Sequence, residues 1–397
     1  MHLVESFACN TGLKISSPFI LDKFVPLPFQ DDYITLQPYG KYDSRKYDYW
    51  DEVIDILAPK LQERNIKILQ IGSPDEKELF GCYNMRGKTD FNQAAYLIKN
   101  SLLHVGIDSF GVHLASGFNK KMVGLYCNMY PSNSGPYWSN KEDVVILEPP
   151  RKEGERPSFS AIEDPKTINA INPEDIALGV SNLLNLDLDY PYKTLRIGRE
   201  YKTRKIELIP AMFIENWSSL GVDSLIVRMD HYFHEDNLVH QLRRCPCSIV
   251  TDKPINLNIL QKYKERINEF VYFVDEDTSP KYFDMLRSFA IPYFLMSNMD
   301  QERIDKVKLN YLDIGPIIHR PKRTLEDVSE LKGKDLSKIF YKTSTYSVFQ
   351  DDIYTSNVFA DGNEPVKRIR NLEPQPVVDD PDFWDESENY LLLEKTS

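Results

Sequence analysis

Long apolar runs are absent from this sequence of 397 residues. A helix needs about 20 consecutive, mostly apolar residues to cross a bilayer, so we expect no membrane span. Positive charge is also scarce, because 48 Lys and Arg stand against 60 Asp and Glu, which gives a net charge of −12. This balance argues against broad binding to nucleic-acid backbones or to anionic membrane surfaces.

Cysteine is rare as well, with five residues in the whole chain. Cys245 and Cys247 are separated by one residue, which is closer than the usual Cys-x-x-Cys metal pair, so neither a zinc site nor a disulfide framework is expected. The first ten residues lack the basic start and the long apolar stretch of a signal peptide. We therefore expect a cytoplasmic protein with reduced thiols.

The residues that are present predict a globular protein with two α/β domains. Hydrophobic residues make up 42% of the chain. Strand-like and helix-like patterns alternate over residues 33–186 and again over residues 205–319, which predicts mostly parallel sheets. We place a first domain at 1–186, a linker at 187–204, a second domain at 205–319 and an irregular C-terminal arm at 320–397. The arm either packs over both domains, which we favour, or docks a protein partner.

The segment Leu102–Tyr137 predicts a strand, a loop, a helix and a second strand. Asp108, Ser109 and His113 lie where the first strand ends and the helix begins. Ligands of open α/β sheets bind at the carboxyl ends of strands, and helix N-termini attract phosphate groups. The segment is therefore a candidate phosphate and sugar site. The alternative is that Asp108 and Ser109 only cap the helix.

A second loop, Gly40–Lys46, also follows a predicted strand and precedes a predicted helix. Its basic side chains, Lys41, Arg45 and Lys46, can neutralise phosphate without a metal ion. The alternative is a solvated basic loop without a ligand.

Several blocks, taken in order, resemble family-nine glycosyltransferases, the ADP-heptose lipopolysaccharide heptosyltransferases and their relatives, over about residues 5–186. The blocks are Tyr33–Gly40, Lys46 with Trp50, Ile66–Gly72, Arg86–Thr89, Asp108–His113, Gly135 with Pro136, and the segment from Asn172 to Leu184. The resemblance implies a nucleotide-sugar-binding domain. The donor-binding residues that it implies are Gly40, Lys46, Lys88, Thr89, Asp108, Ser109, Gly111, His113 and Gly135.

The sequence departs from the family pattern in two ways. Phe110 holds the place where the family usually has glycine after Asp-Ser. The nucleotide-sugar-like half also comes first, whereas the family has its acceptor domain first, so the family's usual aspartate base has no counterpart at its usual place. The resemblance thus implies two Rossmann-like domains facing a cleft, the GT-B architecture, in reversed order and with the C-terminal arm added.

A catalytic base is then expected in the second domain, because an inverting transferase must deprotonate the acceptor hydroxyl. Asp230 is our first choice because it ends the predicted strand Ser224–Met229. The other possible bases in the same loop are His231, His234, Glu235 and Asp236. The loop could equally be a helix-capping acidic loop, and a metal site is a weaker alternative.

A further pair, Asp275 and Asp277, resembles the Asp-x-Asp metal motif of the other glycosyltransferase fold. We favour the simpler interpretation of a capping loop for the helix that begins near Pro280. No metal site is therefore expected.

The sequence thus predicts an inverting, metal-independent glycosyltransferase without a cofactor. A nucleotide-diphosphate sugar would be its donor, and a hydroxyl of a glycan or a similar molecule its acceptor. The alternative is a glycosyltransferase-derived binding or structural module without turnover. The missing family acceptor domain, Phe110 and the unusual C-terminal arm favour that alternative.

Overall fold

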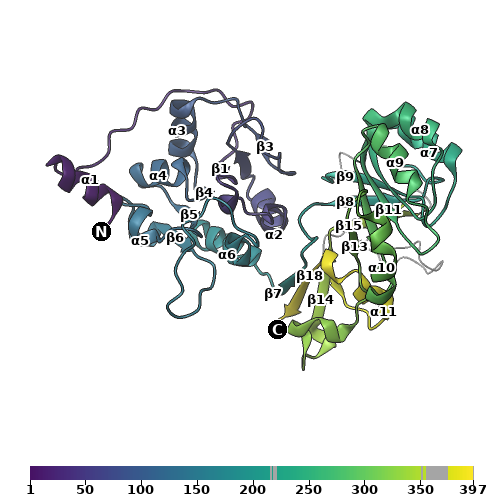
Figure 1. Cartoon of the computed structure of the whole chain (residues 1–397). Helices are drawn as coiled ribbons and strands as arrows, with labels where there is room; N and C mark the ends of the chain where they lie inside the picture. The colour runs from purple at the N-terminus through teal and green to yellow at the C-terminus, as the bar shows by residue number, and fades with distance from the viewer. Residues whose placement is uncertain (215–216, 218–220, 350–351, 355–373, 397) are drawn as a thin grey trace. The chain divides into compact units, whose positions relative to one another are not determined.

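The computed structural model describes residues 1–214, 217, 221–349, 352–354 and 374–396. The chain divides into two compact units, Met1–Pro191 and Tyr192–Ser397 (Figure 1). Each unit is built on its own mainly parallel sheet with helices, as the sequence predicts. Part of the expected C-terminal arm, residues 350–351 and 355–373, lies outside the described residues.

The first unit contains a six-stranded parallel sheet in the order β3-β2-β1-β4-β5-β6. Its strands are β1 Tyr33–Gln37, β2 Lys67–Gln70, β3 Tyr83–Asn84, β4 His104–Ile107, β5 Met122–Leu125 and β6 Val144–Leu147. From β1, strands β2 and β3 follow one another toward one edge of the sheet. Strand β4 then pairs with the other side of β1, and β5 and β6 follow toward the opposite edge. The order therefore reverses between β1 and β4, and this kind of switch point is where open α/β sheets bind ligands.

The longer helices that follow strands of this sheet bury apolar side chains. The helices are α1 Leu3–Thr11, α2 Trp50–Glu63, α3 Phe91–Asn100, α4 Phe110–Gly117, α5 Pro131–Ser134 and α6 Pro173–Leu184. One core joins the sheet to buried side chains of α3 and α4 such as Leu97 and Val112. Helices α2 and α6 pack against each other through their own buried apolar residues. The sheet is thus a rigid support for the loops at its carboxyl edge.

The second unit contains an eight-stranded sheet in the order β13-β12-β11-β10-β9-β8-β15-β16. Its strands are β8 Lys205–Leu208, β9 Ser224–Arg228, β10 Cys247–Thr251, β11 Ile267–Phe273, β12 Tyr293–Ser297, β13 Ile317–His319, β15 Thr345–Phe349 and β16 Asp352–Tyr354. All neighbours are parallel except β15 and β16. Strands β8 to β13 lie side by side in chain order, so this sheet differs in topology from the first.

Sequential strands joined by right-handed crossovers place their helices on one face of a sheet. The helices between these strands are α7 Glu235–Arg244, α8 Leu257–Tyr263, α9 Lys281–Ser288 and α10 Gln301–Val307. Buried side chains of α7, α8 and α9 form one core with every second residue of the first strands, such as Ile206 and Val227. The alternate residues of β8 and β9 point to the opposite, helix-free face.

A four-stranded sheet in the order β17-β14-β18-β7 completes the second unit. Its strands are β7 Tyr192–Ile197, β14 Ile339–Thr343, β17 Gln375–Pro376 and β18 Tyr390–Lys395, and α11 Pro381–Asp385 precedes β18. All its pairings are antiparallel. The expected linker, 187–204, thus includes a strand, and the described parts of the C-terminal arm belong to the second unit, where they form a separate core around Tyr341, Trp384 and Leu392.

All five cysteines are free thiols. In the part of the chain that the structure describes, no helix combines the length and the apolar character that a membrane crossing requires.

One buried histidine in the first sheet predicts a pH dependence of stability. His104 on β4 is fully buried, its Nδ1 lies 3.0 Å from Thr35 Oγ1, and its Nε2 has no hydrogen-bond partner among the described residues. Burial lowers the pKa of His104 from 6.5 to about 3. Between pH 6.5 and about pH 3, His104 is therefore protonated in the unfolded chain but neutral in the folded chain. The folded state loses stability relative to the unfolded state as the pH falls through this range, and keeps it in full above about pH 6.5.

We expect this effect to cost about 2–3 kcal/mol of unfolding free energy at pH 4.5 relative to pH 7.5. Hydrogen exchange of β4 peptides at the two pH values would measure it, with His104→Gln as the comparison that cannot take up the proton. The pH-dependent loss should be smaller in the variant. A wild-type His104 ring that titrates near pH 6.5 by NMR would contradict the prediction, whether or not the variant folds.

Candidate functional site

The predicted donor residues gather at the carboxyl edge of the first sheet, around the switch point between β1 and β4. Arg45, from the loop after β1, joins the two sides of that point. Its guanidinium donates to the Asp108 backbone carbonyl at 2.7 Å, forms an ion pair with the Asp108 carboxylate at 3.1 Å, and donates to Asn128 Oδ1 at 3.1 Å. Arg45 thus fixes the loops after β1, β4 and β5 to one another.

Asp108 is held more tightly than the sequence suggests. Its side chain is 6% exposed, and its second carboxylate oxygen lies 3.8 Å from Nε2 of His113, which is itself 46% exposed. A sugar hydroxyl that donated to the Asp108 carboxylate would therefore compete with Arg45 and His113. Arg45, which the sequence suggests as a phosphate ligand, is instead engaged by Asp108.

Gln37 caps the helix that follows Asp108, and no pattern in the sequence indicates this cap. Its Oε1 accepts a hydrogen bond from the Gly111 N–H at 2.9 Å, and its Nε2 donates to Ser109 Oγ at 3.1 Å. Ser109 occupies the N-cap position of α4 without a side-chain capping bond of its own. Ser109 is thus the N-cap of α4 by position, as the capping interpretation predicts, but the capping hydrogen bond comes from Gln37, and one N–H expected to face phosphate is already satisfied.

Gly111 is required here by close packing. A Cβ at this position would lie 2.5 Å from Gln37 Oε1 and 2.5 Å from His104 Nε2. Gly40 has a similar constraint, because a Cβ there would lie 2.9 Å from the Ile107 side chain. Both predicted donor-site glycines thus let the β1 and β4 loops approach each other.

Lys46 presents an accessible cation beside the switch point. Its side chain is 44% exposed, its ammonium lies 3.9 Å from Asp43, and its backbone forms a bridge with Tyr39. Lys166 donates to the Lys46 carbonyl at 3.1 Å, which fixes the main chain. A fixed backbone with an exposed ammonium suits phosphate binding.

Lys88 and Thr89 follow β3 and lie just before α3. The Lys88 ammonium donates to the Asn84 carbonyl at 2.8 Å. Phe91, the first residue of α3, contacts Phe110, the first residue of α4, with ring centroids 5.7 Å apart, so the two helices begin close together. Phe110, the departure from the family pattern, therefore contributes to packing between these helix ends.

Gly135 follows β5 and has a structural explanation. Its N–H donates to the Pro131 carbonyl at 2.7 Å, and a Cβ there would lie 2.4 Å from that same oxygen. Its carbonyl oxygen lies 3.0 Å from His2 Nε2. Both polar backbone groups of Gly135 are thus engaged within the unit.

Glu76, in the loop after β2, is a candidate that sequence reasoning missed. Burial raises the pKa of its carboxyl group, an effect that the Ser73 N–H and the cations Arg86 and Lys46 oppose. Its Oε2 is buried with no hydrogen-bond partner among the described residues. Gly72, whose φ is +153°, leaves room for this carboxyl group. A partly exposed carboxyl whose pKa is raised by burial, with cations nearby, is a candidate for acid–base chemistry.

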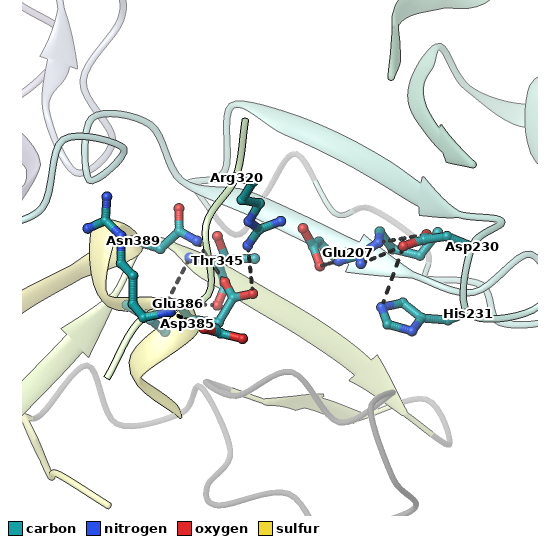
Figure 2. A network of polar contacts seen from close by, with 11 residues as sticks. Glu207, Asp230, His231, Arg320, Thr345, Asp385, Glu386 and Asn389 are labelled. Atoms are coloured by element: carbon teal, nitrogen blue, oxygen red, sulfur yellow. Dashed lines mark hydrogen bonds and ion pairs between the residues drawn. The ribbon is translucent and has the colours of Figure 1, made fainter. Parts of the chain in front are cut away.

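In the second unit, Asp230 follows β9 as expected but is fully engaged (Figure 2). Arg228 donates from Nε and Nη2 to its two carboxylate oxygens at 2.9 and 2.7 Å, and from Nη1 to Glu207 at 2.6 Å. His231 lies 3.9 Å from the same carboxylate. Both carboxylate oxygens of Asp230 therefore already accept a hydrogen bond from Arg228.

The remaining candidates of the second unit stabilise helix starts and loops. His234 is the N-cap of α7 and accepts from the Asn237 N–H. Glu235 accepts from the Asn256 N–H at 2.6 Å. Asp275 accepts from the Asp277 N–H at 3.1 Å and from the Thr278 hydroxyl at 2.6 Å, within the loop before α9. Among the described residues, no group of three His, Cys, Asp or Glu side chains is placed to hold a metal ion.

Comparison with solved structures gives partial matches of low identity. ADP-heptose lipopolysaccharide heptosyltransferase II of E. coli matches with 20% identity over 46% of this chain and 51% of its own length, with a TM-score of 0.30. A family-nine glycosyl transferase of Veillonella parvula matches with 15% identity over 46% of this chain and 50% of its own, with a TM-score of 0.31. The chain thus spans about half the length of these proteins. No curated protein matches it.

A family model gives the more direct result. Residues 8–160 match the model of glycosyltransferase family 9 (heptosyltransferase). This range contains every predicted donor-binding residue and ends before the second unit begins. The resemblance inferred from the sequence is therefore confirmed over residues 8–160 of the first unit, which match this family model.

Proposed function

We propose that the first unit binds a nucleotide-diphosphate sugar at the carboxyl edge between β1 and β4, and that the chain transfers the sugar to a hydroxyl acceptor. The observation that carries the proposal is the reversal of strand order at this point, where the Lys46 loop and the segment Asp108–His113 lie on adjacent strands. Switch points of this kind bind ligands in open α/β sheets. The family match over residues 8–160 supports glycosyl transfer.

The polar groups at this edge suit a diphosphate next to a sugar. The exposed ammonium of Lys46 provides positive charge, and the half-exposed His113 can donate a further hydrogen bond. Arg45 contributes indirectly, because its bonds to Asp108 and Asn128 hold the loops in place. Positively charged side chains can neutralise the diphosphate, which supports a reaction without a metal ion. Inversion at the anomeric carbon and a cytoplasmic location are further parts of the same proposal.

Lys46→Ala should weaken the binding of the cognate nucleotide diphosphate by about 1.5–3 kcal/mol, the range for a lost charge-assisted hydrogen bond. Isothermal titration with ADP, UDP, GDP, CDP and dTDP identifies the nucleotide and measures the loss. Lys67→Ala is the matched control, because Lys67 is 53% exposed at the start of β2, on the opposite edge of the same sheet. The control should bind as the wild type does.

Two outcomes would overturn parts of the proposal. If none of the five nucleotides and none of the corresponding nucleotide-diphosphate sugars binds at millimolar concentrations, the proposed donor site is wrong. Equal affinities for wild type and Lys46→Ala would remove Lys46 from it. Binding without transfer to any hydroxyl acceptor would instead support the alternative of a glycosyltransferase-derived module without turnover.

A further inference from the structure

The helix-free face of the second sheet carries a hollow of about 320 Å³. Lys205, Glu207 and Arg228 project into it from alternate positions of β8 and β9, whereas the intervening residues lie in the core under the helices. Its opposite wall comes from the loop after β13 and from the segment between α11 and β18, with Arg320, Glu386 and Asn389 (Figure 2). The hollow therefore lies within one unit.

Charged side chains of both signs dominate its lining, and three of the cations are paired. Arg228 contacts Glu207, Arg320 contacts Glu386 at 3.0 Å, and Arg323 contacts Glu388. Charged groups in a recess are costly unless they are paired, so these ion pairs account for much of the lining.

The other two cations of the lining, Lys205 and Arg199, have no acidic partner for their side chains among the described residues. Five carboxylates also line the hollow, and two of them, Glu200 and Asp385, lie outside these three ion pairs. Positive charge gathers around Arg323. Burial lowers the pKa of Arg323, and the neighbouring guanidiniums of Arg196, Arg199 and Arg320 lower it further. The hollow can therefore accept one anionic group without rearranging its existing ion pairs.

The rest of the lining suits hydroxyl groups. Thr345 and Asn389 offer neutral hydrogen-bonding groups, and Asp385 offers a carboxylate whose one oxygen accepts from the Arg323 N–H at 2.5 Å. The apolar part of the lining is limited to Ile226, Met296 and Pro321. Among the described residues, no Phe, Tyr or Trp lines the hollow, and the one ring in its lining is the imidazole of His319, so little surface is available for stacking with a flat, apolar ligand.

We propose that this hollow binds a small hydroxylated ligand with one anionic group, namely a sugar phosphate or a sugar acid. Lys205 and Arg199 bind the anionic group, and the carboxylates, Thr345 and Asn389 bind the hydroxyls. A volume of about 320 Å³ is sufficient for one or two sugar rings. This site is separate from the nucleotide site of the first unit, and its existence does not depend on that site.

The test is a titration of the full chain with four probes, glucose 6-phosphate, glucuronate, glucose and inorganic phosphate. At least one of the two anionic sugars should bind about tenfold more tightly than glucose and than phosphate, since only the anionic sugars carry both an anionic group and several hydroxyl groups. The preferred probe distinguishes a sugar phosphate from a sugar acid. Equal binding of phosphate alone would indicate a simple anion site and overturn the proposal, as would the absence of binding by both anionic sugars at millimolar concentrations.

Lys205→Ala should weaken the preferred probe by about tenfold or more. Lys202→Ala is the control, because Lys202 is exposed three residues away and does not line the hollow. Hydrogen exchange of the wild-type chain gives a readout that needs no variant: the probe should protect peptides of β8 and of residues 385–389. Protection confined to the first unit, or unchanged affinity in folded Lys205→Ala, would overturn the assignment. Nucleotide titrations of the same samples report separately on the first unit.

Discussion

Glu76→Gln should lower the rate of glycosyl transfer by about 10²–10⁴-fold, the usual contribution of a general base. Glutamine keeps the shape of the side chain but cannot accept a proton. Glu76 fits the role in two respects: its carboxyl pKa is raised by burial, and it lies within electrostatic reach of Lys46. Nucleotide binding should change little, because the Lys46 ammonium remains.

Asp230→Asn is the paired experiment, because the sequence favours Asp230 as the base. Both oxygens of Asp230 are bound by Arg228, whereas one oxygen of Glu76 has no partner among the described residues. Turnover lost only in Glu76→Gln would assign the base to the first unit. Turnover lost only in Asp230→Asn, with the fold intact, would exclude Glu76 and restore the prediction from the sequence. Single-turnover rates at saturating donor separate this chemical step from binding.

The sequence predicted most helices and strands of both sheets because their signals are local. The strand Cys247–Thr251 and the helix Glu235–Arg244 are examples, since an apolar run and a helical period are visible within a few residues. Helix α1 lies before the first region in which strand-like and helix-like patterns alternate. Its nine residues bury no side chain, and it is stabilised by a capping box between His2 and Glu5, which apolar periodicity does not reveal.

Contacts between distant segments could not be predicted in the same way. Strand β7 lies in the segment that the sequence predicts to be a linker. It could not be predicted as a strand from local pattern, because its partner, β18, comes about 200 residues later in the chain. The same holds for the candidate site. Its position at strand ends follows from local pattern, but the cap from Gln37 and the ion pair of Arg45 with Asp108 depend on which strands become neighbours. Pairing of β1 with β4 brings these residues together, and no single segment encodes that pairing.

Arg228→Met should lower the unfolding free energy of the second unit by about 3–5 kcal/mol, because removal of one partner leaves buried charges without compensation. The Arg228 side chain is 10% exposed, and its two acidic partners, Glu207 and Asp230, are 14% and 13% exposed. Methionine fills a similar volume, so the loss reports on charge more than on a cavity. Urea unfolding followed by hydrogen exchange of β8 and β9 peptides would measure it within this unit.

Arg303→Met is the matched control for this prediction. Arg303 also binds one carboxylate through Nε and Nη2, that of Glu276 at 3.0 and 3.1 Å, but both side chains are 47% exposed. Solvent screens such a pair, so the control should leave stability nearly unchanged. The triple variant Arg228→Met, Glu207→Gln, Asp230→Asn should recover much of the loss, because no unpaired charge remains. Equal destabilisation by Arg228→Met and Arg303→Met, or no recovery in the triple variant, would show that the network in Figure 2 acts through packing and not through its buried charges.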